Sequence, residues 1–240
     1  MYIGRLGDGS NPDDGIYVLF KEVVDNAVDE FIMGAGKRIV TKVENLPEGG
    51  ASVSIRDYGR GIPLGKVIEC VSVINTGAKY NDDVFQFSVG LNGVGTKAVN
   101  ALSSHFRVAA FRKGEYFEAV FERGVLVSKK GGKTREKDGT LVEFHPDPKI
   151  FGDYAFNMEF VEKRVWHYAY LNSGLALELN GQEYSSTNGL LDLLKDEIGD
   201  GALYDIGYWR GERIEFAFTH TGDYGEEYFS FVNGQHTSDG

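Results

Sequence analysis

The stretch at residues 20–32 constrains the fold most, because its pattern is that of an amphipathic helix docked on a core. Its apolar side chains recur at the three- and four-residue spacing of one helical face: Phe20, Val23, Val24, Ala27, Val28 and Phe31. The opposite face carries carboxylates and an amide: Glu22, Asp25, Asn26, Asp29 and Glu30. The sequence therefore predicts a core helix whose polar face needs an explanation.

The polar face of this helix has two interpretations. A solvated surface stripe is the commoner one for an isolated helix. However, Asp25 lies one turn from Asp29 with no basic residue between them, an arrangement that is mildly destabilising. Glu22 and Asn26 also lie one turn apart, and a carboxylate and an amide oxygen can share a hard metal ion and the water beside it. We therefore expect a compensating cation on this face.

Length and composition describe an ordinary folded protein. A chain of 240 residues with 42% hydrophobic content can form one domain with an appendage or two modest domains. No apolar run approaches the roughly 20 residues that a membrane-spanning helix needs, and no signal peptide opens the chain, so we expect a soluble, cytoplasmic protein without a membrane partner.

The single cysteine and the net charge exclude further classes. Cys70 has no second cysteine for an internal disulfide, cannot form a zinc cluster by itself, and lies in an apolar segment that favours a buried structural thiol. The formal net charge of −11 argues against a large DNA-binding face on this segment. We expect nucleic acid to be met mainly by other parts or partners.

The second informative stretch is the loop at residues 57–63, which follows an expected antiparallel hairpin of strands 37–44 and 51–56. Asp57 leaves the strand and is followed by two glycines and a proline, so the backbone can approach a ligand closely. A plain turn is the alternative. Asp57 can accept a hydrogen bond from the exocyclic amine of a purine, and Ile62 and Pro63 offer an apolar wall for the ring.

The third stretch is a glycine-rich loop before a helical run at residues 98–102. Glycines at positions 90, 93 and 95 leave backbone N–H groups free beside a helix N-terminus, which suits a polyphosphate. The preceding segment, 77–88, has little periodicity and is typical of a mobile lid. The loop lacks the ending of a P-loop and the strand-first setting of a dinucleotide fold, but Lys79 and Lys97 flank it as counter-charges.

Together these three stretches resemble the GHKL ATPase superfamily, which includes gyrase-type topoisomerases, MutL mismatch-repair proteins, ninety-kilodalton heat-shock chaperones and sensor histidine kinases. The pattern is Glu22-x-x-x-Asn26, Asp57-x-Gly59-x-Gly61 and Gly90-x-x-Gly93-x-Gly95. The fuller motifs are similar to the ATPase region of the B subunit of bacterial type IIA topoisomerases: Met1-Tyr2-Ile3-Gly4, residues 22–26, 57–63 and 90–95, and Val99-Asn100-Ala101-Leu102-Ser103. The runs 77–80 and 95–97 favour topoisomerase IV B subunits over gyrase B subunits.

The resemblance implies an α+β fold, the GHKL or Bergerat two-layer α/β sandwich, with a mixed, mostly antiparallel sheet and helices on one face. It divides the chain into a GHKL ATP-binding domain at residues 1–186 and the truncated beginning of a transducer domain at residues 187–240. The expected elements are strands 106–112, 116–121, 125–128, 138–144, 175–179 and 182–185, helices 65–76 and 160–170, and in the second domain a helix at 190–195 with strands 203–209, 213–218 and 228–232.

The resemblance also implies roles for residues at an ATP and Mg2+ site. Glu22 would be the general base, Asn26 would ligate Mg2+, and Asp57 and Thr140 would bind adenine. Gly61, Ile62 and Pro63 would line the base, and Arg60 would lie along the pocket edge and pair with Glu30. The phosphates would be held by Asn92, Gly93, Val94, Gly95 and Thr96, with Lys79 and Lys97 as counter-charges.

The implied activity is ATP hydrolysis that couples dimer closure to DNA strand passage in decatenation and relaxation. The implied partners are the topoisomerase A-type subunit, a second B subunit, and DNA through the holoenzyme, and the pocket is expected to accept ATP-competitive inhibitors. Family members carry an arm upstream of the first residue and a phosphate-contacting lysine beyond the last one. We therefore expect this fragment to bind nucleotide, to hydrolyse it poorly and to be monomeric.

Several other classes remain open. A gyrase B subunit, with negative supercoiling as its activity, is the nearest alternative. The amino-acid sequence of residues 1–4 and 57–63 disfavours a mismatch-repair or chaperone ATPase. A sensor kinase would need a phosphoacceptor histidine upstream, whereas all five histidines follow the nucleotide motifs. A non-catalytic nucleotide-sensing module is disfavoured by Glu22.

Overall fold

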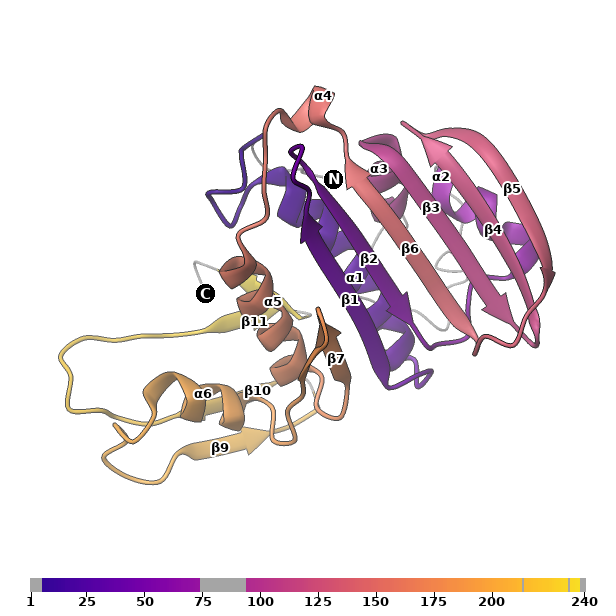
Figure 1. The fold of residues 1–240 in the computed structure, drawn as a ribbon. Helices are drawn as coiled ribbons and strands as arrows, with labels where there is room; N and C mark the ends of the chain where they lie inside the picture. Colours follow the sequence, from indigo (N-terminus) through magenta and orange to yellow (C-terminus); the bar gives the residue numbers. More distant parts are fainter. Residues whose placement is uncertain (1–5, 74–93, 213, 233, 238–240) are drawn as a thin grey trace.

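An eight-stranded sheet forms the main body of the protein (Figure 1). The computed structural model describes residues 6–73, 94–212, 214–232 and 234–237. The strand order is β5-β4-β3-β6-β2-β1-β7-β8, and every neighbouring pair is antiparallel except β1 and β7. The strands are β1 (Arg38–Asn45), β2 (Ala51–Asp57), β3 (Ser103–Arg112), β4 (Glu115–Glu122), β5 (Val125–Lys133), β6 (Gly139–Pro146), β7 (Ala176–Leu179) and β8 (Gln182–Tyr184). The expected mixed, mostly antiparallel sheet is confirmed.

The register of the central strands separates an apolar face from a polar one. In β2, Val53 and Ile55 are buried and lie opposite Phe144 and Val142 of β6. The alternate residue Ser54 points to the other face, where it lies opposite Glu143. This two-residue alternation is typical of an antiparallel sheet with one face on a core and one face toward water.

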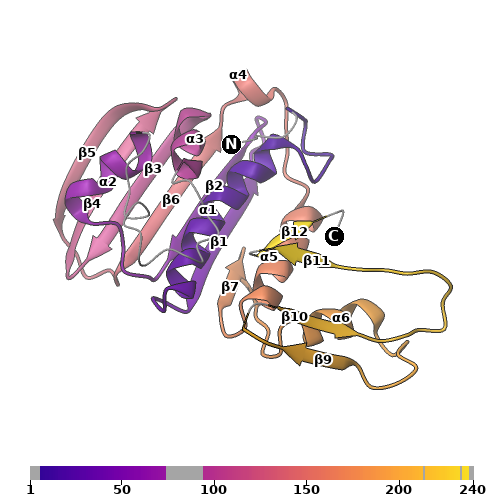
Figure 2. The same cartoon turned by 180° about the vertical axis from the view of Figure 1, so that it is seen from behind.

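Helices cover the apolar face of the sheet (Figure 2). They are α1 (Gly15–Ile32), α2 (Val67–Ser72) and α3 (Gly95–Ala101), and a 3-10 turn, η1 (Leu64–Lys66), precedes α2. The apolar face of α1 is almost fully buried, since Phe20, Val24 and Val28 are each at most 1% exposed. The two-layer arrangement expected from the sequence is confirmed, with the core between these helices and β1, β2, β3, β4 and β6.

Another helix lies beside α1 toward the C-terminal part. Helix α5 (Met158–Leu171) follows the single turn α4 (Pro148–Phe151) and packs on β7 and β8. The side chain of Asn157 caps α5 by accepting a hydrogen bond from the backbone of Glu159. Helix α6 (Leu190–Ile198) then packs against both α5 and β10.

The C-terminal part contains two small sheets (Figure 1). One pairs β9 (Gly207–Arg210) with β10 (Glu215–Phe218), and the other pairs β11 (Ser230–Val232) with β12 (Gln235–Thr237). The strands expected at 203–209, 213–218 and 228–232 correspond to β9, β10 and β11, which begin at Gly207, Glu215 and Ser230, and β12 was not expected. Their side chains are largely exposed, so the alternation that sets strand ends in the main sheet is weak here.

One local expectation was wrong in detail. The helix expected at 65–76 begins as the 3-10 turn η1, and its α-helical part ends at Ser72. Asp14 stands at the N-cap of α1, but its carboxylate turns backward to accept hydrogen bonds from Gly9 and Asn11 rather than from the first turn of the helix. Within the described residues, no helix has both the length and the apolarity needed to cross a membrane.

Candidate functional site

The polar face of α1 divides into two halves with different surroundings. Asp25 and Asp29 are 2% and 1% exposed. Asp25 receives Lys21 Nζ at 2.7 Å and the hydroxyl of Tyr168 from α5. The compensating cation expected on this face is, at Asp25, the side chain of Lys21, one turn toward the N-terminus. The other half, with Glu22, Asn26 and Glu30, faces α3 and the loop after β2.

Glu22 and Asn26 lie against the beginning of α3. The side-chain amide of Asn26 donates to the Glu22 carbonyl at 2.6 Å and to the Thr96 hydroxyl at 2.9 Å. A methyl group on Gly95 would lie 1.9 Å from Glu22 Oε2, so the carboxylate occupies the space that any larger residue would fill. The glycine at 95 therefore permits a close approach between the α1 carboxylate and the α3 backbone.

Asp57 is a buried carboxylate at the end of β2, 7% exposed. It accepts hydrogen bonds from the Gly59 backbone at 2.8 Å and from the Thr140 backbone at 3.2 Å. The pKa of Asp57 is raised to about 6, chiefly by burial; the charge of Glu30 contributes to the rise, and the two backbone donors and Arg56 oppose it. Asp57 is thus an ionisable acceptor that can change protonation state near neutral pH.

The loop after Asp57 is held to α1 by an ion pair. Arg60 donates to Glu30 through its backbone N–H at 2.9 Å, through Nε at 3.1 Å and through a terminal nitrogen at 2.9 Å. A methyl group on Gly59 would lie 2.6 Å from Glu30 Oε2, which explains the glycine before Arg60. The expected pairing of Arg60 with Glu30 is confirmed.

Gly61 and Gly139 allow the loop to lie close to the ends of β3 and β6. Gly61 has φ +71°, and a methyl group there would lie 2.6 Å from the Phe111 carbonyl and 2.8 Å from the Gly139 carbonyl. Gly139 has φ +134°, and a methyl group there would lie 2.2 Å from the Asp57 carbonyl. These positions bring Thr140, half-buried at the start of β6, beside Asp57. Ile62 packs against the core.

The remaining expected site residues differ in how the structure places them. Pro63 is exposed at the far end of the loop. Val94, Gly95 and Thr96 begin α3, next to Glu22 and Asn26. Lys97 is 6% exposed, and burial lowers the pKa of its ammonium group, while the neighbouring Cys70 and Glu69 of α2 oppose that shift. Lys79, Asn92 and Gly93, and the expected lid at 77–88, lie outside the described residues.

The donor set fits a cation that arrives with a phosphate ligand. Among the described residues, no group of three or more His, Cys, Asp or Glu side chains could hold a metal ion. Asn26 engages Glu22 and Thr96 through its amide nitrogen, so its oxygen is the atom suited to a hard cation. Mg2+ is commonly bound by one or two protein groups together with substrate phosphates and water, which this site can provide.

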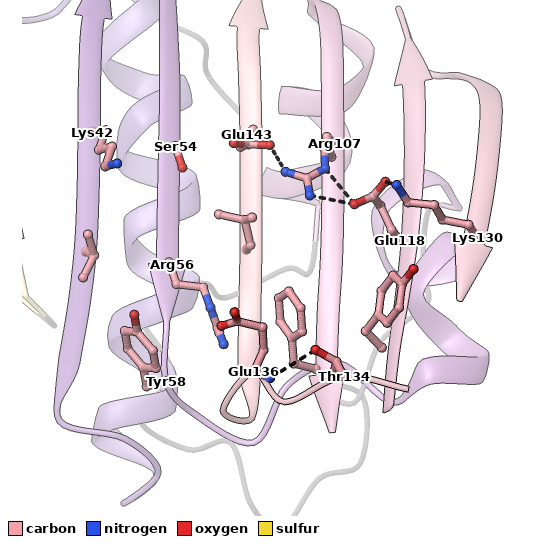
Figure 3. Close-up of a pocket in the computed structure, with 14 residues that line it drawn as sticks. Lys42, Ser54, Arg56, Tyr58, Arg107, Glu118, Lys130, Thr134, Glu136 and Glu143 are labelled. Atoms are coloured by element: carbon pink, nitrogen blue, oxygen red, sulfur yellow. Dashed lines mark hydrogen bonds and ion pairs between the residues drawn. The ribbon is translucent and has the colours of Figure 1, made fainter. Parts of the chain in front are cut away.

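A separate hollow of about 560 Å3 lies on the polar face of the sheet, away from α1 (Figure 3). Arg107 bridges Glu118 and Glu143 there, and Glu118 also pairs with Lys130 at 3.0 Å. Arg56 lies between the rings of Tyr58 and Phe111, at 4.6 and 4.5 Å from their centres. None of the expected site residues lines this hollow, and its charged groups largely satisfy one another.

Sequence reasoning missed two residues that support the loop. The side chain of Arg56 donates to the Asp57 carbonyl and to the Lys137 carbonyl at 2.5 Å, which fixes the end of β2 to the segment before β6. Arg112 donates to the Gly61 carbonyl at 3.3 Å. No sequence signal identifies them, because both contacts join segments that are distant in the chain.

Comparison with known families gives one match over most of the described site. The family described as "Histidine kinase-, DNA gyrase B-, and HSP90-like ATPase" matches residues 11–150. These residues contain α1, the loop after β2, α3 and Thr140.

Individual relatives are similar over the whole chain. The chain is 63% identical to the B subunit of DNA topoisomerase 4 from Borreliella burgdorferi and covers 39% of that protein. It is 35% identical to the B subunit of DNA gyrase from Thermus thermophilus, covering 40% of that protein. The chain therefore spans about two fifths of the length of these relatives.

A solved structure shares the fold. The 43K ATPase domain of Thermus thermophilus gyrase B, in complex with an aminocoumarin, superposes with a TM-score of 0.78 at 30% identity. The match covers 100% of this chain and 65% of that one.

Proposed function

Because the chain belongs to the histidine kinase-, DNA gyrase B- and HSP90-like ATPases, we propose that it is the ATP-binding and ATP-hydrolysing region of a topoisomerase IV B subunit. The 63% identity to the B subunit of a topoisomerase 4 over the full chain supports this choice. The observation that carries the chemistry is the junction of α1 with α3, where the Glu22 carboxylate lies against Gly95 and Asn26 donates to Thr96.

Adenine is bound by Asp57 and Thr140 in this proposal. The Asp57 carboxylate accepts the hydrogen bonds of two backbone amides, and an ionised carboxylate has lone pairs for a third donor, the exocyclic amine of the base. Gly61 brings the loop backbone close to the ring, and Ile62 and Pro63 supply apolar contact. Arg60 and Glu30 close the edge of the site by holding the loop on α1.

The phosphates are bound at the beginning of α3, by Asn92, Gly93, Val94, Gly95 and Thr96, with Lys79 and Lys97 supplying positive charge. Asn26 would hold Mg2+, and the bound cation would supply positive charge to the phosphates. Glu22 accepts the proton of the attacking water and orients it. A positioned general base contributes about 10² to 10⁴ in rate.

The test of this assignment is Glu22→Gln in the full-length protein assembled with its A-type partner. Gln keeps the size of the side chain next to Gly95 and removes the basic oxygen. We expect nucleotide affinity by calorimetry within about threefold of the parent and turnover reduced by about 10² or more. Glu44→Gln, which changes an exposed carboxylate on β1 outside the proposed site, is the matched control and should retain most turnover. Hydrolysis by Glu22→Gln at the parental rate would refute the base assignment.

The whole protein is proposed to couple ATP-driven closure of two B subunits to DNA strand passage in the cytoplasm, with an A-type subunit holding the cleaved DNA. We propose residues 1–186 as the ATP-binding domain and 187–240 as the start of the transducer. A gyrase B subunit is the second candidate, favoured by the 35% identity and shared fold with Thermus thermophilus gyrase B. Decatenation without negative supercoiling by the reconstituted enzyme would support topoisomerase IV.

A further inference from the structure

The outer edge of the main sheet carries a concentration of positive charge on an acidic protein. Six of the 25 Lys and Arg residues fall between positions 123 and 137, together with one acidic residue, although the chain as a whole has a net charge of −11. Strand β5 and the segment that follows it contain five of them. These residues therefore form a local exception to the charge of the chain.

Four of these cations have no ion-pair partner among the described residues: Lys129, Lys133, Arg135 and Lys137. All four are exposed. The other two cations of the stretch are neutralised, Arg123 by Asp147 at 2.5 Å and Lys130 by Glu118 at 3.0 Å. Lys133 lies opposite Glu115 in the register, and Glu136 lies inside the segment, yet no ion pair joins either to the four cations. We call these four residues the basic edge.

The basic edge is accessible to a large ligand. β5 pairs with β4 on one side and forms the outer edge of the eight-stranded sheet on the other. Figures 1 and 2 both show β5 at the rim farthest from β9 and β10. Every residue of β5 is exposed. After β5, the backbone N–H of Thr134 donates to the Gly114 carbonyl. The segment then reaches the end of the sheet near Asp57, where the Lys137 carbonyl accepts a hydrogen bond from Arg56.

We propose that the basic edge binds the phosphate backbone of duplex DNA. Exposed cations without an ion-pair partner are the electrostatic signature of polyanion binding, whereas Arg107 and Lys130 in the hollow on the polar sheet face are neutralised by carboxylates. Residues 125–137 contain no aromatic side chain on which unpaired bases could stack, which favours a duplex over a single strand. The choice of DNA rather than an acidic protein rests on the proposed function.

The size of the effect follows from counterion release. Each neutralised phosphate contributes about −0.9 to the slope of log affinity against log salt concentration, so four contacts give about −3.6. Affinity should therefore fall about 150-fold between 50 and 200 mM salt. The net charge of the chain weakens binding at every salt concentration, and the contact is sequence-independent because it involves phosphates.

The experiment measures binding of a fluorescent 30-base-pair duplex to the full chain by anisotropy at 50 to 200 mM salt. The test variant combines Lys129→Gln, Lys133→Gln, Arg135→Gln and Lys137→Gln. The control variant combines Lys37→Gln, Lys149→Gln, Lys163→Gln and Lys195→Gln, which are exposed lysines on other elements and remove the same charge. We expect the test variant to lose at least tenfold affinity at 50 mM salt and most of the salt slope, and the control variant to lose less than threefold.

Three results would overturn the proposal: no binding by the parent chain at 50 mM salt, equal losses in the two variants, or tighter binding of a polyglutamate peptide than of DNA. Nucleotide affinity, measured by calorimetry on the same samples, should be the same in all three proteins. If the parent chain binds nucleotide but not DNA, the result counts against the basic edge alone. If the parent chain binds DNA but not nucleotide, the result counts against the proposed function alone.

Discussion

Replacing Gly95 with alanine should reduce the rate of ATP hydrolysis without lowering the stability of the protein. The new methyl group would lie 1.9 Å from Glu22 Oε2, whereas ordinary contacts begin near 3.4 Å, so the carboxylate oxygen must move by about 1.5 Å. The atom that must move is the far end of a flexible side chain, so the displacement itself costs little stability. Alanine also favours helix over glycine by up to about 1 kcal/mol.

The catalytic consequence is larger. A misplacement of about 1 Å at a reacting group can cost about 10²-fold in rate, which corresponds to about 2.7 kcal/mol in the activation barrier. We therefore expect Gly95→Ala to reduce turnover of the assembled enzyme by about 10² at saturating ATP, with a midpoint of urea unfolding equal to or above that of the parent.

Gly65→Ala is the matched control, because a methyl group at Gly65 meets nothing within 4 Å. It should leave both turnover and stability near the parental values. The reasoning fails if Gly95→Ala hydrolyses ATP within twofold of the parent. It also fails if Gly95→Ala is destabilised by more than about 2 kcal/mol, because the loss of activity would then reflect unfolding.

Three further predictions concern Asp57, Gly61 and Tyr168. The pKa of Asp57 is raised to about 6, chiefly by burial, so its carboxylate gains a proton as the pH falls through that value, and nucleotide affinity measured by calorimetry should drop up to about tenfold per pH unit below it. Asp57→Asn should bind nucleotide weakly and retain only the pH dependence of the nucleotide phosphates. Parallel plots of affinity against pH for the parent and Asp57→Asn would contradict the assignment. Gly61→Ala should weaken nucleotide binding at least tenfold, because its methyl group meets two carbonyls. The control is Gly174→Ala, which has a similar backbone strain at φ +88° but no atom within 4 Å of the new methyl group. Equal nucleotide affinities in the two variants would show that the close approach at Gly61 does not matter for binding. Tyr168→Phe should lower the free energy of unfolding in urea by about 1.5–3 kcal/mol, because Asp25 loses a buried donor. Its control is Tyr116→Phe, a half-buried tyrosine whose hydroxyl makes no hydrogen bond to the described residues, and an unchanged midpoint for Tyr168→Phe would show that the Asp25 contact contributes nothing.

Local patterns in the sequence were enough to predict most of the main sheet. The alternation in residues 37–44 and 51–56 predicted the β1–β2 hairpin, because one side of each strand is buried and the other faces water. The three- and four-residue spacing from Phe20 to Phe31 predicted α1 for the same reason. In β9 and β10 most side chains are exposed, so neither strand has a buried face to mark its ends.

Contacts between distant segments limited prediction of the site. The acidic face of α1 was treated as one surface, but Asp25 faces Tyr168 of α5, a residue 143 positions away. The glycines at 59 and 61 were interpreted as allowing close approach to a ligand, and Gly95 as part of a phosphate loop. In the fold, protein atoms of Glu30, Phe111 and Glu22 lie close to these three positions, and no local pattern predicts those contacts. Strand β5 extends to Lys133, beyond the expected strand at 125–128, and includes Gly131 and Gly132, which pair with β4 although glycine is depleted in strands.

The central claim is that a nucleotide binds between α1, the loop after β2 and the beginning of α3. A crystal structure of this chain with Mg2+ and a non-hydrolysable ATP analogue tests it most directly. We predict the adenine amine within hydrogen-bonding distance of the Asp57 carboxylate, Mg2+ on Asn26 Oδ1 and Glu22 facing the terminal phosphate. A nucleotide in the hollow lined by Lys42, Arg56 and Tyr58, on the other face of the sheet, would contradict it.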